Sequence, residues 1–147
     1  RLILEAARQL RSKYIMGLDS RDVLVLDDPH ILLEEFINGF DCNLVFAGDR
    51  FNWPNLKEFK HFEDSVAPNY PKSEFKYVSG GCWIGTRDFI GDFFAEAVKQ
   101  EALPQAPESE QGILKKLFPD FYPQVQIDYY CKLFQNIGYL ASPILEF

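Results

Sequence analysis

Two aspartates three residues apart form the strongest chemical signal in the sequence. They belong to the run Asp19-Ser20-Arg21-Asp22, which follows an apolar segment typical of a buried strand. Two carboxylates with this spacing on a turn can converge on one hard divalent cation, whose remaining positions take phosphate oxygens and water. In an open α/β sheet, such a ligand lies beyond the carboxyl ends of the strands. Because Asp and Ser also form ordinary solvated turns, the motif alone leaves both interpretations open.

A pair of glycines interrupts an aromatic-rich segment typical of a strand over residues 77–85. The run is Ser79-Gly80-Gly81. Adjacent glycines weaken a strand, so they are tolerated where a ligand or another backbone must approach closely. A bulge or a corner of the sheet is the alternative. The segment therefore predicts either a ligand-facing strand or a bulge.

Two acidic residues and one tryptophan are further candidates for a catalytic or sugar-binding site. Glu108 and Glu110 stand just before a predicted helix, where they can receive a substrate hydroxyl or act as a base. The helix dipole alone also favours acids at such a position. Trp53 offers an aromatic platform of the kind that stacks on sugar rings, or else it packs its loop onto the core. His30 and His61 have no second histidine at ligand spacing, so we expect surface histidines.

Helices and strands alternate along the chain, which predicts the α/β class with a mixed or mostly parallel sheet. Apolar residues at helical spacing predict helices over residues 2–10, 29–38, 89–98 and 113–118. Apolar and β-branched runs predict strands over residues 14–18, 23–26, 44–47, 77–85, 125–128 and 133–135. Gly48-Asp49 ends one of these strands where a backbone turn can meet a ligand, and residues 50–74 are expected to form a long loop.

The second predicted helix carries the clearest boundary signals. Asp28 is a suitable N-cap, a proline follows at the first helical position, and Gly39 is a plausible stop. Its predicted buried face consists of Ile31, Leu32, Phe36 and Ile37.

Length and composition predict one globular domain over residues 1–147. The chain is 47% apolar and 25% charged, and its 9 glycines and 9 prolines form no repeat or linker. Its 15 basic and 22 acidic residues give a net charge of −7, and the basic residues are scattered, which argues against a nucleic acid or an anionic membrane as partner. A phosphate-bearing ligand would therefore need a metal.

No apolar run approaches the ~18 residues needed to span a bilayer, and the start at Arg1 resembles an entry into mid-chain.

The cysteine count leaves the compartment open. Cys42, Cys82 and Cys131 are an odd number without C-x-x-C spacing, which argues against a zinc site and against a full disulfide framework. We expect buried free thiols, and one disulfide with a spare thiol is the alternative.

Five segments, taken in order, resemble the glycosyltransferase domain of the procollagen lysyl hydroxylases and their procollagen glycosyltransferase relatives. They are D-S-x-D after an apolar strand, L-V-F-A-x-D with N-W-P behind it, Y-V-S-G-G-C-W-I-G before an amphipathic helix, E-S-E-Q, and I-D-Y-Y-C-K-L-F-Q-N-I. The resemblance runs from Leu2 to Gly138 and implies the Rossmann-like GT-A fold, a nucleotide-sugar transferase core with helices flanking a mixed, mostly parallel sheet. The family's first nucleotide-binding strand and its C-terminal segment with a histidine metal ligand would be missing, so the domain would be partial.

The resemblance also implies roles for individual residues. Asp19 and Asp22 match the metal-binding carboxylates of the family, which implies Mn²⁺ or Mg²⁺ as cofactor. The residues implied to bind or border the nucleotide sugar are Ser20, Arg21, Asp49, Trp53, Ser79, Gly80, Gly81 and Gln111. Glu110 or Glu108 is the candidate catalytic base if transfer inverts the anomeric centre. Asp128 and Gln135-Asn136 match a late segment of the family.

The implied activity is metal-dependent transfer of a hexose, glucose or galactose, from a UDP-sugar to a hydroxyl of a glycan or a hydroxylysine-type protein. Two departures leave the base and sugar open: Arg21 stands where the family has an aromatic residue, and Val78 where it has asparagine. A non-catalytic carbohydrate-binding or interaction domain is the alternative, and metal-assisted phosphoester hydrolysis is a third. A procollagen-type relative would act in the lumen of the secretory pathway, and a microbial one in the cytoplasm.

Overall fold

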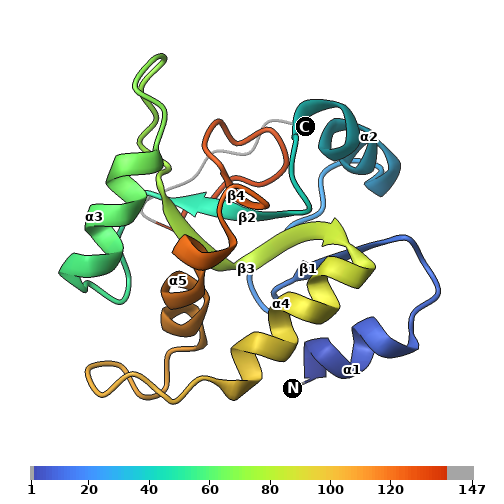
Figure 1. Cartoon of the computed structure of the whole chain (residues 1–147). Coiled ribbons are helices and arrows are strands. Elements are labelled where there is room, and N and C mark those ends of the chain that lie inside the picture. Colours follow the sequence, from blue (N-terminus) through green and yellow to red (C-terminus); the bar gives the residue numbers. More distant parts are fainter. Residues whose placement is uncertain (1, 139–147) are drawn as a thin grey trace.

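The computed structural model describes residues 2–138 and has an α/β fold (Figure 1). Residues 1 and 139–147 lie outside the described part. In chain order the elements are α1 (Leu2–Gln9), β1 (Tyr14–Leu18), α2 (Pro29–Gly39), β2 (Leu44–Asp49), α3 (Lys57–Val66), β3 (Tyr77–Thr86), α4 (Arg87–Lys99), α5 (Glu110–Phe121) and β4 (Val125–Asp128). Every predicted helix is present, and α3 is one helix more than the sequence predicts.

The four strands form one mixed sheet in the order β1-β3-β2-β4. β3 runs antiparallel to both β1 and β2, whereas β4 is parallel to β2. A mixed sheet is confirmed, but the prediction of mostly parallel pairing is wrong. The segment that follows β2 returns to the sheet at the edge where β2 ends, with Tyr77 opposite Asp49, so β3 must run back along β2. Alternation of helices and strands does not reveal at which edge of the sheet a connection ends.

Apolar side chains cover both faces of the sheet. On one face, Leu44 and Phe46 of β2 belong to a core shared with α1, α4 and α5. On the other face, Val45 and Ala47 pack with Phe36 of α2. Alternate strand residues thus point to opposite faces, as the pleat requires. Figure 1 shows α1, α4 and α5 on one side of the sheet and α2 on the other.

The second predicted helix forms with the expected cap but a different buried face. The Asp28 carboxylate accepts a hydrogen bond from the backbone N–H of His30 at 2.8 Å. Phe36 is buried, whereas Ile31 and Ile37 are about half exposed, so their predicted burial is wrong. α2 packs against the sheet along a narrower stripe than its apolar composition suggests.

Residues 50–74 are not a continuous loop, because they contain α3. The helix buries Phe59 and, one turn later, Glu63. An acidic residue thus occupies a core-facing position, and it weakens the apolar periodicity by which the helix could have been recognised.

Two predicted strands are absent. Residues 23–26 form no strand, and Leu24, Val25 and Leu26 are each at least 60% exposed. Residues 133–135 form no strand either, because a buried carboxylate takes up the backbone N–H groups there. Asp128, which has no exposed surface, accepts hydrogen bonds from the N–H groups of Lys132, Leu133 and Phe134 at 2.7–2.9 Å.

We expect Asp128→Asn to lower the free energy of unfolding by about 2–3 kcal/mol, because it replaces charge-assisted bonds and turns an amide N–H toward backbone donors. Urea denaturation measures the change. Asp120→Asn is the matched control, since Asp120 lies exposed on α5; its effect should stay within about 0.5 kcal/mol. Equal stability of the two variants would show that Asp128 does not hold this loop.

Candidate functional site

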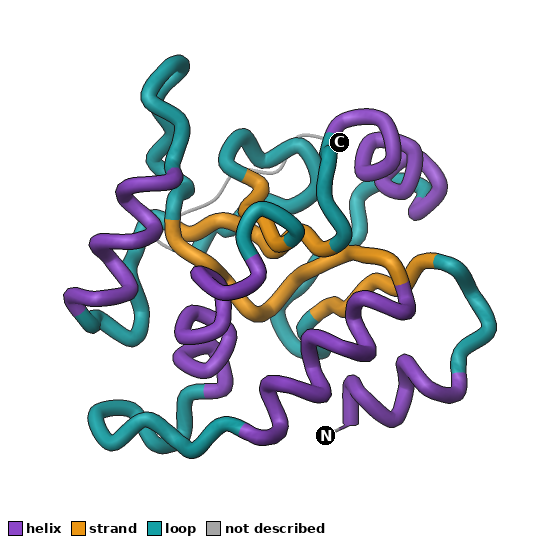
Figure 2. The backbone as a smooth tube through the Cα atoms, in the orientation of Figure 1, coloured by secondary structure: helices purple, strands orange, loops and turns teal. Residues whose placement is uncertain are grey.

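The glycine pair lies in a bulge of β3. Phe46 of β2 is paired with Trp83, but the next residue, Ala47, is paired with Ser79. Residues 80–82 therefore have no partner on β2, and Figure 2 shows the strand bending midway. The bulge interpretation of the glycine pair is confirmed.

The bulge brings the two strongest sequence signals together. β1 ends at Leu18, opposite Cys82, so Asp19 follows at the level of Gly81. A Cβ atom placed on Gly81 would lie only 3.3 Å from Asp19 Oδ2. Glycine at this position therefore leaves the room that the Asp19 carboxylate occupies.

The negative charge of the second aspartate of the motif acts on Cys82, the residue after Gly81. Burial raises the pKa of the Cys82 thiol above its ordinary value, a hydrogen bond with the Asp19 backbone lowers it, and the negative charges of Asp19 and Asp22 raise it further. Both carboxylates are thus close enough to Cys82 to act on it electrostatically. All three cysteines are free thiols, as the sequence predicts, but they are only partly buried.

The exposed turn of Asp19 and Asp22 fits a hard divalent cation only in part. Among residues 2–138, no group of three or more His, Cys, Asp or Glu side chains is arranged to hold a metal ion. The two carboxylates would supply some of the oxygen ligands, and phosphate oxygens and water would have to supply the others. The metal site stays a prediction, as do the roles of the exposed Ser20 and Arg21 between the two aspartates.

Gln111 connects the bulge to the loop over residues 50–56, called the tryptophan loop after Trp53. Its side-chain oxygen accepts a hydrogen bond from the backbone N–H of Gly80 at 2.9 Å, and its side-chain nitrogen donates to the carbonyl oxygen of Trp53 at 2.6 Å. α5 begins just before Gln111, where Ser109 caps the helix by accepting from the N–H of Gly112. The cap and the first turn of α5 therefore fix Gln111 against both segments.

Trp53 borders a cavity of about 360 Å³ that the loop before α5 also lines. Glu108, Glu110 and Gln111 line the same cavity, so the structure places both candidate bases beside the tryptophan. The Trp53 residue is 63% exposed, which agrees with an aromatic platform and not with a side chain packed onto the core. The roles of these residues in binding or catalysis stay predictions.

Asp49 and Ser79, which are also predicted to bind or border the nucleotide sugar, have structural partners. The carboxylate of Asp49 accepts from the backbone N–H of Phe51 and from the side chain of Asn136, at 2.9 and 2.8 Å. Asp49 therefore ties the end of β2 to the segment that follows β4. Ser79 is paired with Ala47 at the start of the bulge.

Sequence reasoning missed a buried polar cluster beside the site. Lys115 of α5 and Glu63 of α3 form an ion pair at 2.9 Å, with their side chains 0% and 1% exposed. Lys115 also donates to the side-chain oxygen of Asn52 at 2.6 Å. A signal was present, because Lys115 stands among the inward positions Leu114, Leu117 and Phe118 and one turn after Gln111.

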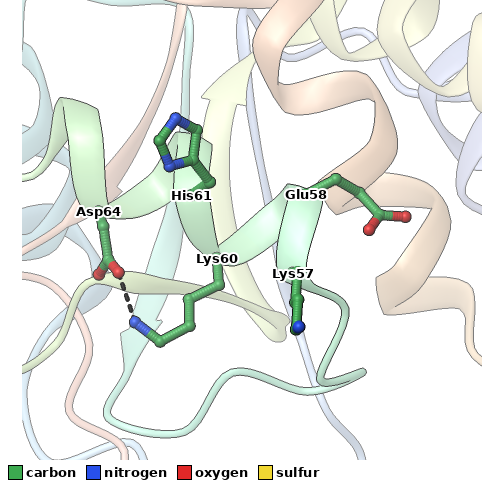
Figure 3. A pocket seen from close by; sticks show the side chains of 5 residues that line it. All are labelled: Lys57, Glu58, Lys60, His61 and Asp64. Carbon is green, nitrogen blue, oxygen red and sulfur yellow. Dashed lines mark hydrogen bonds and ion pairs between the residues drawn. The ribbon is translucent and has the colours of Figure 1, made fainter.

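A second hollow, of about 560 Å³, lies on α3 away from all predicted site residues. It is lined by Lys57, Glu58, Lys60, His61 and Asp64 (Figure 3). Partial burial acts to raise the pKa of Asp64, but hydrogen bonds from Lys60 and Lys76 lower it to about 2. His30 and His61 are both exposed, as predicted.

The mixed sheet with helices on both faces is a GT-A-like α/β core. Residues 1–145 match the PLOD GT domain, and the chain therefore belongs to this glycosyltransferase family. It is also 28% identical, over 127 residues, to an uncharacterized protein of Acanthamoeba polyphaga mimivirus. That match covers 84% of this chain and 25% of the viral protein, so the chain spans about a quarter of that relative's length. No helix among the described residues is long and apolar enough to cross a membrane.

We expect Gly81→Ala to weaken Mn²⁺ binding at the predicted site by about ten-fold, because the Asp19 carboxylate must shift by a few tenths of an ångström to make room for the new methyl group. Titration of Mn²⁺ followed by electron paramagnetic resonance measures the affinity. Gly91→Ala is the control, since a Cβ atom at Gly91 meets nothing within 4 Å. If both folded variants bind Mn²⁺ like the unaltered protein, Asp19 does not belong to a metal site.

Proposed function

We propose that this domain transfers a hexose from a UDP-sugar to a hydroxyl acceptor, with a divalent cation at Asp19 and Asp22. One observation carries the proposal: the bulge of β3 joins the Asp19 carboxylate, through Gly80 and Gln111, to the cavity bordered by Trp53. This series of contacts has acidic groups at one end and an aromatic platform at the other, an arrangement that suits a diphosphate linked to a sugar. Family membership supports the glycosyltransferase class.

The acidic end would bind the diphosphate of the donor. Mn²⁺ or Mg²⁺ bound by the two carboxylates would stabilise the charge that develops on the departing diphosphate. With a net charge of −7, the protein as a whole repels a free nucleotide diphosphate, and a bound cation would reverse the sign of the charge locally. Arg21, exposed between the two aspartates, adds a guanidinium that can pair with phosphate oxygens.

The cavity end would bind the transferred sugar and the acceptor. The exposed face of Trp53 can stack on a sugar ring. Glu108 and Glu110 line the same cavity, so either carboxylate can accept the proton that an attacking hydroxyl releases in an inverting transfer. A glycan or a hydroxylysine-type protein would supply that hydroxyl.

The first test is a calorimetric titration with UDP, UDP-glucose and UDP-galactose, with and without Mn²⁺. We expect binding only when Mn²⁺ is present, and no binding by Asp19→Ala or Asp22→Ala, because each change removes a carboxylate ligand. Asp92→Ala, at an exposed position of α4, should bind like the unaltered protein. Metal-dependent binding that survives in both aspartate variants would refute the proposed donor site.

One observation favours a second function, a non-catalytic carbohydrate-binding domain. Among the described residues no third carboxylate, cysteine or histidine is arranged with Asp19 and Asp22 to hold a metal ion, whereas the Trp53 cavity requires no metal. Binding of free hexose or glycan by a folded chain that does not respond to UDP and Mn²⁺ would support this function instead.

We expect Glu110→Gln to lower turnover by about 10²–10⁴-fold if Glu110 is the base, because glutamine cannot accept the proton. The affinity for the UDP-sugar should change little. The same measurement on Glu108→Gln separates the two candidates, since both residues border the cavity. Turnover at the unaltered rate in Glu110→Gln would remove Glu110 from the mechanism.

A further inference from the structure

Two parallel chains of contacts link β3 to the tryptophan loop, one from the bulge itself and one from Val78 just before it. In the first, Gln111 joins the N–H of Gly80 to the carbonyl oxygen of Trp53. In the second, the N–H of Val78 donates to Glu63 at 2.8 Å, Glu63 pairs with Lys115, and Lys115 donates to Asn52. The contacts begin two residues apart on β3 and end on consecutive residues of the loop.

Lys115 lies at the centre of the second chain. Its ammonium group pairs with Glu63, bonds to Asn52, and lies 5.3 Å from the centre of the Tyr77 ring. These three partners come from α3, the loop before it, and the first residue of β3. One buried cation thus connects three segments, each of which lies far from Lys115 in the sequence.

We propose that Lys115 is a positioning residue that sets the place of Trp53 relative to the bulge. Its side chain has no exposed surface, so it cannot touch a ligand. It acts through Asn52, which precedes Trp53 directly in the chain, while Gln111, one turn earlier on α5, holds the carbonyl oxygen of Trp53 itself. The consequence for sugar binding rests on the proposed function.

The buried pair of Glu63 and Lys115 is better suited to positioning its neighbours than to stabilising the fold. Burial raises the pKa of Glu63 and lowers that of Lys115, while their mutual attraction opposes both shifts. Two charges in a protein interior commonly stabilise the fold no more than apolar side chains of similar size would. Their bonds do require defined directions, so they fix where Asn52 and Val78 lie.

The test uses the two tryptophans as reporters in 5-fluorotryptophan-labelled protein. Trp53 is 63% exposed beside the cavity, and Trp83 is 5% exposed in the core. We expect Asn52→Ala to shift the ¹⁹F resonance of Trp53 and leave that of Trp83 in place. Asn52→Asp keeps an oxygen that can accept from Lys115 but loses the side-chain N–H bonds to Asn55 and Leu56, so its Trp53 resonance should move less than that of Asn52→Ala.

A second set of variants tests the cation itself. Lys115→Met alone leaves Glu63 buried without its partner and can prevent folding, so the double variant Lys115→Met/Glu63→Gln removes both charges together. The double variant should shift the Trp53 resonance as Asn52→Ala does. Lys116→Met, on the exposed neighbour of Lys115, is the control and should shift neither resonance.

The outcomes separate this inference from the proposed function. An unmoved Trp53 resonance in Asn52→Ala and in the double variant overturns the inference, and so does an equal shift of both tryptophans, which would indicate a general structural role. With the expected shift, affinity for UDP should hold while affinity for UDP-glucose or UDP-galactose falls by roughly ten-fold. If the unaltered protein binds no UDP-sugar, the proposed function fails, and the ¹⁹F result alone decides whether Lys115 positions Trp53.

Discussion

The candidate site depends on a difference between β1 and β2, which pair with β3 over different lengths. β1 and β2 run in the same direction on either side of it, but β1 ends opposite Cys82 while β2 continues until it faces Tyr77. β3 must therefore pair on both sides in its second half and on one side only in its first half. The bulge at residues 80–82 lies at this change, and a bulge locally bends and twists a strand. The bend leaves the backbone of Gly81 against the Asp19 carboxylate, where a larger residue would crowd it.

The candidate site also depends on α5, because this helix holds the bent part of β3 and the tryptophan loop together. Its first two turns present Gln111 and Lys115 on the same side, one turn apart. Gln111 holds the bulge and the tryptophan loop directly, and Lys115 holds the same two segments through Glu63 and Asn52. The loop could otherwise pack in several ways, since Trp53 itself buries little of its surface. Polar contacts with defined directions therefore position an aromatic side chain that the core does not hold.

The sequence predicted local features better than contacts between distant segments. β1, β2 and the capped start of α2 were predictable because each has a strong local signal, namely an apolar run or an aspartate before a proline. The antiparallel β3 was not, because its direction depends on the edge at which the chain returns. α3 was hidden because Glu63 takes a core position and finds its partner 52 residues later in Lys115. Asp19 and the glycine pair were both singled out, but their contact follows from strand register, which periodicity does not reveal.

Arg21 and Val78, the two departures from the pattern that the resemblance implies, have different surroundings. Arg21 is exposed between the paired aspartates, so a change there can directly alter the contacts of the proposed donor site. Val78 has no exposed surface and packs in the core, while its N–H is held by Glu63. An asparagine at that position would place an amide in an apolar environment, where it would need a hydrogen-bond partner. Any effect of Val78 on donor choice must therefore pass through the backbone of the bulge, whose position the Glu63–Lys115 pair helps to set.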